Sequence, residues 1–464
     1  MRTLRTLTSA LVAALIASCA NVTALPPPSA GPPASERPPL SPSQPPATVT
    51  ALPATAATVP LSTATRPPNT TPAALRLVTP PPEARLTINC FTLLPARPAG
   101  LASNGVIVLE DGPGHKTIFM DLATGSETLV QPPDENRVSF VFSPDRRWVA
   151  YRRIVQDQMR IQVLENSLVI ANARNHVIKV LPWEAGWSQL AGWLDNDRLV
   201  INLAGQDPAE STAKKPASLM ILSLATGARK ILRSEFPNIT LEYPVPDWDN
   251  WGVTMYDTSL TRVVYASDVF ETGRLSYALW DLDEQRALAS VPAGLLLHTP
   301  RWSPDGSRFV VAANAQTADT WLTFELYSAA RAGGQVRRLT HLTSHYAKVY
   351  IQSYTWSPDG RWIAFWFVAN PEGVPFIEHG AAHLGVLDIE SGAVTNTCVP
   401  GEHDASLAAA RVPPPLWSPD GRQIIVESSS ADGSSRVLLV DLASSVAAQI
   451  AEEVRPEGWM AGDS

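Results

Sequence analysis

The sequence predicts an all-β protein built as a ring of repeated four-stranded sheets, a β-propeller. Two observations carry this prediction. The pentapeptide Trp-Ser-Pro-Asp-Gly occurs three times, beginning at Trp302, Trp356 and Trp417, each time before a run of strand-favouring residues. Between these copies lie short apolar segments joined by polar turns, such as MILSLATGARKIL and GVLDIESGAVTNT. Units of four short strands that recur every roughly 40–60 residues are typical of propeller blades.

Weaker copies of the aromatic-and-turn unit extend the series and place Phe142, Trp193, Tyr256 and Trp459 in the tryptophan position. The first unit, NGVIVLEDGPGHKTIFMDLATG, has no aromatic strand before it, and the C-terminal PEGWMAGDS has no strand after it. Together the two ends complete one blade, which closes the ring and removes open sheet edges. We count seven blades; six or eight stay open, because the region 158–187 is irregular.

The repeated tetrapeptide Ser-Pro-Asp-Gly has a structural explanation. Proline presets φ at the second position of a type I turn, aspartate suits the third, and glycine takes the left-handed conformation that a bulged hairpin needs. The tryptophans should pack between neighbouring blades. The alternative, aspartates acting as acids or metal ligands, is not needed to explain the motif. The structural turn residues are Trp302, Pro304, Asp305, Gly306, Trp356, Pro358, Asp359, Gly360, Trp417, Pro419, Asp420 and Gly421.

Residues 1–18 have the pattern of a targeting segment. Arg2 and Arg5 precede an apolar run from Ala10 to Ala17, which is too short for a stable membrane span. The following tetrad, Ile16-Ala17-Ser18-Cys19, resembles a bacterial lipobox. This resemblance implies that Cys19 is acylated and anchors the chain to a membrane outside the cytoplasm. An ordinary signal peptide with an incidental cysteine is the alternative.

The next segment, residues 19–88, is rich in proline, serine, threonine and alanine. Such a composition cannot bury enough apolar surface to fold, so we expect a disordered, extended tether. The propeller is then expected to span residues 89–464. The remaining cysteines, Cys90 and Cys398, fall at the start and near the end of that span. Outside the cytoplasm, a disulfide that clamps the entry strand is one reading, and two buried free thiols are the other.

The Trp-Ser-Pro-Asp-Gly repeats resemble the WD-repeat-like propeller of the TolB type, found in periplasmic TolB proteins and as the non-catalytic propeller of prolyl-oligopeptidase-like peptidases. The resemblance covers roughly residues 100–464 and implies a fold rather than a function, because the motif is structural. TolB-like proteins carry an N-terminal α/β domain, where this chain has a proline-rich segment. The peptidases carry a Gly-x-Ser-x-Gly elbow, and this sequence has no such pentapeptide.

The connections between strands divide into two classes. In a four-stranded blade the turns after the first and third strands share one face, and here they are short and stereotyped. The other connections share the opposite face and are long and varied, and variable loops on a rigid scaffold commonly bind ligands. This second face, the loop face, is therefore the candidate functional face. Its expected loops are 204–216, 231–245, 267–274, 340–352, 368–382 and 399–413.

Histidines concentrate in one sector of the loop face, next to Glu378, Glu402 and Asp404. Imidazole and carboxylate together suit zinc or a similar ion. The spacing matches no standard metal motif, and solvated polar loop residues are the alternative. The candidate ligands are His341, His345, His379, His383 and His403.

The net charge of −8 and the absence of a basic stripe argue against nucleic acid as a partner. We expect a monomeric, lipid-anchored protein of the periplasm or cell surface, a non-enzymatic binding scaffold for an envelope protein, a peptide or a glycan, with no required cofactor. Two alternatives stay open. One is a metal-dependent hydrolase or lyase that uses the histidine sector, and the other is a purely architectural envelope protein.

Overall fold

The computed structural model describes two short strands at residues 73–74 and 76–78 and most of residues 86–462. The chain divides into two units, Met1–Thr65 and Arg66–Ser464, and the described residues all belong to the second. The targeting segment, Cys19 and most of the expected tether lie outside them. No helix in the described part is long and apolar enough to cross a membrane. The gaps after residue 86 are 100, 102, 112–115, 131–134, 158–161, 185–186, 204–217, 234–256, 258, 260, 268–275, 282, 285, 291–299, 315–322, 371–380, 402–411 and 430–433.

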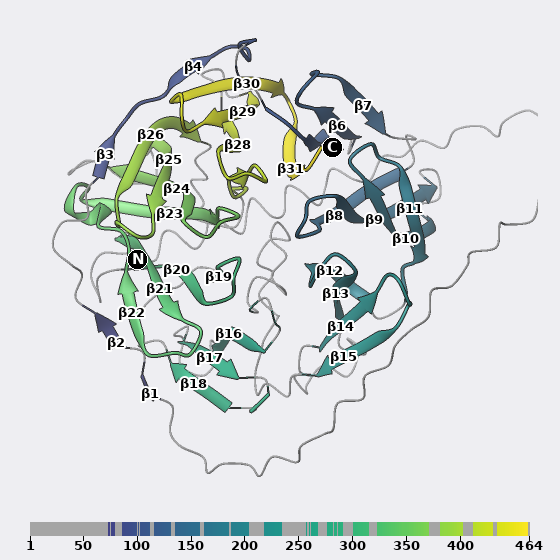
Figure 1. Ribbon diagram of the computed structural model, residues 1–464, viewed down its shortest axis with the longest axis horizontal. Coiled ribbons are helices and arrows are strands. Elements are labelled where there is room, and N and C mark those ends of the chain that lie inside the picture. The colour runs from purple at the N-terminus through teal and green to yellow at the C-terminus, as the bar shows by residue number, and fades with distance from the viewer. Residues whose placement is uncertain are drawn as a thin grey trace, which may run out of the picture. The chain divides into compact units, whose positions relative to one another are not determined.

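The described chain forms an all-β propeller, in which antiparallel sheets are arranged around a centre (Figure 1). Six blades are complete, each with four antiparallel strands from the inner to the outer edge. Their strands are β31 (Arg455–Met460), β5 (Val106–Asp111), β6 (Lys116–Asp121) and β7 (Glu127–Val130); β8 (Glu135–Phe142), β9 (Trp148–Asp157), β10 (Gln162–Asn172) and β11 (Val177–Pro182); β12 (Trp187–Trp193), β13 (Arg198–Leu203), β14 (Ser218–Ser223) and β15 (Arg229–Arg233); β19 (Arg301–Trp302), β20 (Arg308–Asn314), β21 (Phe324–Ala330) and β22 (Gln335–Arg338); β23 (Lys348–Trp356), β24 (Trp362–Asn370), β25 (Ala381–Asp388) and β26 (Val394–Gly401); β27 (Leu416–Trp417), β28 (Gln423–Ser429), β29 (Ser435–Asp441) and β30 (Val446–Glu452).

A further sheet contains three antiparallel strands, β16 (Arg262–Ser267), β17 (Ser276–Asp281) and β18 (Arg286–Ser290). The aromatic strand expected to end at Tyr256 would complete it, but that strand falls outside the described residues. The β-propeller fold is therefore established, whereas the count of seven blades stays a prediction.

The two chain ends meet in one blade, as the sequence predicts. Strand β31 pairs antiparallel with β5, and Trp459 lies opposite Ile107. The ring therefore closes by hydrogen bonds between the first long strand of the chain and the last.

The apolar core lies between blades, and the two-residue period of the strands explains why. In β5, Val106 and Val108 pack against the β8–β11 blade, while Ile107 and Leu109 pack against the β27–β30 blade. Successive side chains point to opposite faces, so a strand buried on both faces reads as a continuous apolar run. The described apolar clusters each join two neighbouring sheets in this way.

The motif tryptophans add a directional link between blades. The indole Nε1 of Trp356 donates to the carbonyl of Arg301, the residue just before Trp302 in the preceding blade, at 3.0 Å. Trp417 repeats the bond to the carbonyl of Thr355, just before Trp356, at 3.3 Å. Trp193 donates in the same way to Val141 at 3.0 Å. Each bond therefore fixes the height of one blade against the next.

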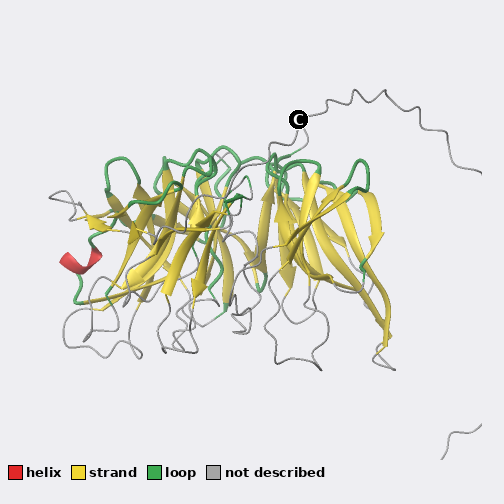
Figure 2. Ribbon diagram, turned by 90° about the horizontal axis from the view of Figure 1, so that it is seen from below, coloured by secondary structure: helices red, strands yellow, loops and turns green. Residues whose placement is uncertain are grey.

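The Ser-Pro-Asp-Gly turns follow directly after these aromatic residues. Gly306 N donates to the carbonyl of Ser303 at 2.8 Å, and Gly306 has a left-handed φ of 67°. Asp305 accepts hydrogen bonds from the hydroxyl of Ser303 and from Ser307 N, which hold the pKa of the Asp305 carboxyl below its ordinary value. The aspartate is thus engaged within its own turn. Figure 2 shows such described turns gathered along one side of the ring.

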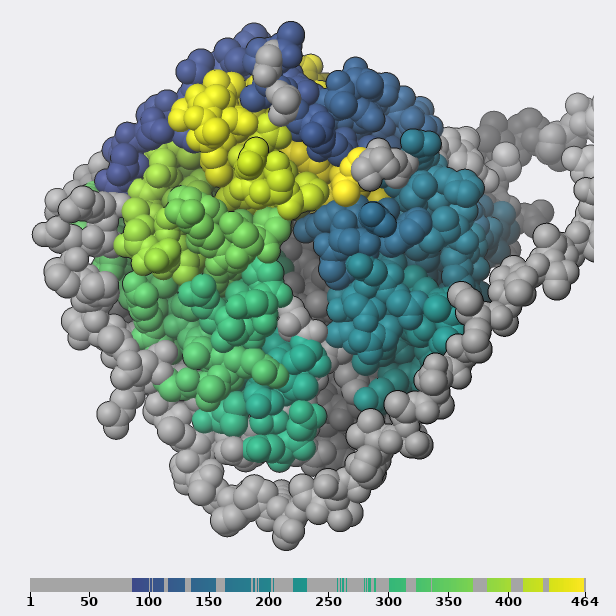
Figure 3. Space-filling view, in the orientation of Figure 1, coloured from purple at the N-terminus to yellow at the C-terminus, as the bar shows by residue number. Residues whose placement is uncertain are grey.

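The proline-rich segment does not stay a tether up to residue 88. Four short strands between residues 73 and 94 form what we call the belt, and each is parallel to the outer strand of a different sheet (Figure 1). The strands are β1 (Ala73–Ala74) on β18, β2 (Arg76–Val78) on β22, β3 (Leu86–Ile88) on β26 and β4 (Thr92–Leu94) on β30. Figure 3 shows the described β3 and β4 region, in purple, outside the green and yellow blades.

Strands β1, β2 and β3 of the belt thus lie before residue 89, where the sequence places the start of the propeller. The physical reason is that short proline-free segments, such as Arg76–Val78, keep their backbone N–H groups and can pair with an open sheet edge. The average composition of the segment conceals these few residues.

Replacing Trp356 with phenylalanine should weaken the contact between the β19–β22 and β23–β26 blades. The variant Trp356→Phe removes the indole donor, leaves the Arg301 carbonyl without this hydrogen bond, and opens space in a buried site. We expect the free energy of unfolding to fall by about 2 kcal/mol. Urea unfolding, followed by circular dichroism, measures the change. A loss below about 0.5 kcal/mol would show that the indole bond does not hold the blades together.

Candidate functional site

The loop face is only partly described, and several of its expected loops are shorter than predicted. Residues 348–352 belong to β23, 368–370 to β24, 381–382 to β25, and 399–401 to β26. These residues are mainly apolar or β-branched, so the ladders continue through them. The intervening connections 371–380 and 402–411, with His379 and His403, lie outside the described residues.

A buried carboxylate shapes the described part of the histidine sector. Glu325 on β21 accepts hydrogen bonds from Leu342 N at 3.0 Å and Thr343 N at 2.8 Å, and it pairs with Arg338. These bonds hold the 3-10 turn η3 (Leu342–Ser344) against the blade. The oxygens of the Glu325 carboxylate are therefore used in structural hydrogen bonds and an ion pair.

Two candidate metal ligands flank this turn. His341 immediately precedes η3, and His345 immediately follows it. Burial, followed by the nearby Arg338 charge, lowers the pKa of His341, while Glu325 opposes the shift. His341 therefore favours the neutral imidazole, the form that can ligate a metal.

His383 is not a loop residue as predicted, because it lies within β25 opposite Phe367 and Pro400. Its ring centroid is 5.8 Å from that of Phe367, and its Nδ1 is buried with no hydrogen-bond partner. Burial lowers the pKa of His383, so the ring favours its neutral form. Strand pairing explains the placement, since the buried Ala382, Leu384, Val386 and Leu387 around it form the nearly continuous apolar run of a strand covered on both faces.

The described residues contain no group of three or more histidine, cysteine, aspartate or glutamate side chains that could hold a metal ion. With His379 and His403 outside the described ranges, the five-histidine site stays a prediction. The described members, His341, His345 and His383, do not form such a group among themselves and their described neighbours.

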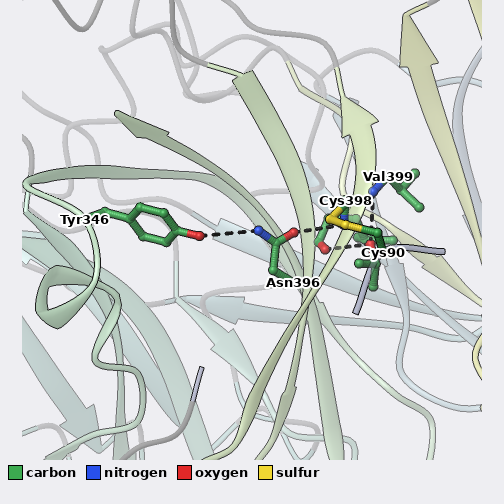
Figure 4. The surroundings of a disulfide bond; sticks show 7 residues. Cys90, Tyr346, Asn396, Cys398 and Val399 are labelled. Atoms are coloured by element: carbon green, nitrogen blue, oxygen red, sulfur yellow. Dashed lines mark hydrogen bonds between the residues drawn. A yellow bond between two sulfur atoms is a disulfide. The ribbon is translucent and has the colours of Figure 1, made fainter. Parts of the chain in front are cut away.

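The second candidate feature is the cysteine pair. Cys90 and Cys398 form a disulfide with a Cα–Cα distance of 4.7 Å, across a sequence separation of 308 residues (Figure 4). Cys90 lies in the belt between β3 and β4, and Cys398 lies in β26. The backbone is bonded on both sides, since Asn89 N donates to Asn396 O and Phe91 N donates to Thr397 O, both at 2.9 Å. The bridge therefore fastens the belt to the outer strand of one blade.

A bulge in β26 prepares Cys398 for this bond. The register shifts between His383 and Gly385, and Cys398 takes a left-handed φ of 56°. Cys398 N donates to the side-chain oxygen of Asn396 at 2.9 Å, and the amide nitrogen of Asn396 donates to the Tyr346 hydroxyl at 3.4 Å (Figure 4). Bulges redirect side chains, and this one directs a sulfur toward the belt.

A third feature, which the sequence analysis missed, is a pair of carboxyl groups in the closing blade. Glu457 on β31 hydrogen-bonds with Glu110 on β5, and Arg455 Nε lies 3.6 Å from a Glu457 oxygen. Burial, together with the charges of Glu110 and Glu427, raises the pKa of Glu457 to about 7, against the pull of Arg455. Glu110 lies near the start of the propeller sequence and Glu457 near its end, so only the pairing of β31 with β5 in the closed ring reveals the cluster.

Comparisons with known proteins agree on the fold alone. No protein-family model matches the sequence, and no curated protein matches it. Solved structures that resemble the chain include an oligogalacturonate lyase in complex with manganese, with 14% identity, 76% of this chain and 86% of that chain covered, and a TM-score of 0.46. A putative TolB from Agrobacterium tumefaciens has 14% identity, 76% and 90% coverage, and a TM-score of 0.31. The β-propeller domain of the Trilobed protease from Pyrococcus furiosus has 13% identity, 70% and 84% coverage, and a TM-score of 0.40.

Removing the disulfide should destabilise the ring and release the belt. In the double variant Cys90→Ser/Cys398→Ser, we expect the free energy of unfolding to fall by about 2–5 kcal/mol, because the bridge closes a long loop in the unfolded chain. Amide exchange in β3 and β4 should also become faster.

Chemical reduction provides the control for this change. Dithiothreitol should lower the stability of the parent by a similar amount and leave the double variant unaffected. A parent protein whose stability does not respond to reductant would contradict a disulfide between these two residues.

Glu457 should make stability depend on pH. Its pKa rises from an ordinary 4.5 to about 7 in the folded protein, so between these pH values the folded state binds more protons than the unfolded state. The free energy of unfolding therefore falls as pH rises through this interval. Glu457→Gln stays uncharged, so we expect it to exceed the parent by about 2–3 kcal/mol at pH 8 and to match it near pH 4.5.

Urea unfolding at pH 4.5 and pH 8 tests this expectation. The control is Glu127→Gln, which changes an exposed carboxylate at the start of β7 and should retain the pH dependence of the parent. Equal pH dependence in the parent and in Glu457→Gln would show that this carboxyl is not the origin of the effect.

Proposed function

We propose that this protein is a lipid-anchored, extracytoplasmic binding scaffold, a seven-bladed propeller whose loop face holds an envelope protein, a peptide or a glycan. The lipobox-like tetrad ending at Cys19 supports the anchor, with the proline-rich residues before the belt as the tether. The disulfide between Cys90 and Cys398 supports a compartment outside the cytoplasm, where such bonds persist.

The place of a three-stranded sheet between two complete blades supports the proposed count of seven. The sheet of β16, β17 and β18 lies in the chain between the β12–β15 and β19–β22 blades. It packs on the β19–β22 blade through Val264, Leu279, Phe309 and Val311. A fourth strand ending near Tyr256, as the sequence predicts, would give this sheet the same number of antiparallel strands as the complete blades.

The observation that carries the binding proposal is the difference between the two faces of one blade. On one face, residues 357–361 connect β23 to β24 by a closed turn in which Gly360 N donates to Ser357 O at 2.9 Å. On the other, the connection from β24 to β25 spans 371–380, and that from β26 to β27 spans 402–415. A rigid blade that bears long, sequence-varied connections on one face is the usual architecture of a binding surface.

Shortening the loops tests this function. We replace residues 371–380 and 402–411 with short Gly-Ser linkers and recover partners from envelope membranes of the native host by affinity capture after crosslinking. We expect the partners captured by the parent to be lost or reduced about tenfold in the loop variant, because the loops supply the contact surface.

The matched control changes the opposite face of the ring. It replaces residues 443–445, in the β29–β30 turn, with a linker of equal length and should capture the same partners as the parent. Unchanged capture by the loop variant, with its fold intact by circular dichroism, would contradict binding at the loop face.

A further inference from the structure

The belt covers only part of the rim, which we define as the outer strands of the sheets. Strands β1 to β4 pair in parallel with β18, β22, β26 and β30. The other outer strands are β7, β11 and β15, and each is the last strand of its sheet in the part of the chain that the structure describes. One sector of the rim is thus capped by added strands, and in the other sector, where the described residues add no strand, we call the outer strands open edges.

Exposed apolar side chains lie in the uncapped sector. Among the described residues, the large hydrophobic side chains that are exposed belong either to the belt itself or to the three blades with open edges. The latter are Leu129 on β7, Val163, Leu164, Val177, Ile178 and Val180 on β10 and β11, and Ile231 on β15. Aliphatic residues on an open edge strand favour pairing with another strand.

Strand β11 is the richest of these edges. Val177, Ile178 and Val180 are 39%, 48% and 46% exposed. By contrast, Val336 on β22 and Val394 on β26, two strands that the belt covers, are 4% and 2% exposed. Strand β11 therefore exposes apolar side chains on both faces of its sheet, where an added strand would contact them.

The hydrogen bonds of β11 show which backbone groups face outward. Trp183 N donates to Asn166 O on β10 at 2.9 Å. In an antiparallel pair, bonded and non-bonded positions alternate, so Leu181 and Lys179 bond to β10. The N–H and C=O of Val180, between them, point away from β10 toward the open edge. The same alternation makes Pro182 the next outward position, which offers a C=O but no N–H, and a register shift opposite Ile170 and Ala171 interrupts the pattern before Lys179. Val180 is therefore the outward donor of β11, which matches a pair as short as those of the belt, which span two or three residues.

We propose that the open edge of β11 is a docking site for an extended segment of a partner protein, which adds to the blade as a fifth strand. The belt shows that this rim accepts added strands, and its segments indicate the chemistry: Leu86–Ile88 and Thr92–Leu94 are short, uncharged and rich in leucine, isoleucine and threonine. The partner segment carries aliphatic residues, which pack on Ile178 and Val180 while its backbone pairs with β11. This site extends the proposed function to a second surface, distinct from the loop face.

A labelled peptide tests the site directly. The probe is a fluorescein-labelled synthetic peptide of residues 84–94 of this chain with Cys90→Ser, which contains two segments that the rim already accepts. Fluorescence anisotropy measures its binding to the full-length protein. We expect saturable binding that weakens about tenfold, or about 1.4 kcal/mol, in Val180→Pro, because proline removes the outward N–H.

Val180→Thr is the matched control, since it keeps the N–H and loses only part of the apolar side chain. It should weaken binding less than Val180→Pro does. Thermal unfolding of both variants should stay within about 2 °C of the parent, because Val180 N–H is not bonded to β10. If Val180→Pro unfolds the blade, Ile178→Asp, which alters only a side chain, takes its place with the same expected loss.

Hydrogen exchange identifies where the peptide lies. Saturating peptide should slow amide exchange in residues 177–182. Protection of β22, β26 or β30 instead would mean that the peptide displaces the belt, and protection of the loop face alone would assign it to the first surface; either result overturns the β11 site. The loop-shortening experiment and the peptide experiment have independent outcomes. If shortening the loops does not reduce partner capture, the binding of the peptide to β11 is not affected, so either proposal can fail without the other.

Two other occupants give distinct results. If peptide binding appears only after residues 20–65 are deleted, the edge is not available to a partner in the intact chain. If the protein dimerises with increasing concentration, Val180→Pro abolishes the dimer and the peptide does not bind, the edge pairs with a second copy. Each of these outcomes overturns the assignment to a partner segment.

Discussion

The ring depends on one repeated interaction, the hydrogen bond from a motif indole to the carbonyl just before the aromatic residue of the preceding blade. Trp356, Trp417 and Trp193 all make it. Apolar packing between blades is strong but not directional, so it does not by itself fix the height of one sheet against the next. The indole bond does so, because donor and acceptor must meet within a few tenths of an ångström and in line.

The closing interface solves the same problem without an indole donor. Phe142 takes the tryptophan position, and its ring lies where a side chain on Gly458 would be, since a Cβ there would come within 2.0 Å of the Phe142 ring. Gly458 precedes Trp459 as Arg301 precedes Trp302. At these four interfaces the position before the aromatic residue receives the neighbouring blade, either through its carbonyl or through the absence of a side chain, whereas the indole of Trp459 donates instead to the carbonyl of Asn104 at 3.0 Å.

These constraints explain which features the sequence could reveal. The turn motif, the aromatic positions and the two-residue apolar period are local, so a single chain displays them, and the propeller follows. The belt is not local, because β3 pairs with residues more than three hundred positions away in the sequence. The paired segment is also only three residues long. Proline-rich composition conceals such segments, since three pairing residues barely change the average.

The same distinction applies to the sites. The histidine sector was visible as a cluster of one residue type, but the burial of His383 depends on how far the β24–β25 ladder continues. The Glu110–Glu457 pair could not be seen at all from spacing, because it exists only once both chain ends share a blade. Cys90 and Cys398 were noticeable for being few, while the bulge that directs Cys398 outward required the structure.

The position of the disulfide gives the belt a mechanical asymmetry. Strands β1, β2 and β3 precede Cys90, whereas β4 follows it. Tension from the N-terminal side acts first on the short parallel pairs of β1, β2 and β3, which have few hydrogen bonds each. The force then reaches the disulfide between Cys90 and Cys398 in β26. Beyond this bond the force is spread over the whole β23–β26 sheet rather than over a single short strand. If the proposed anchor holds the chain at its N-terminal end, the disulfide at Cys90 would therefore shield the propeller from the load, and the belt strands before Cys90 would detach first.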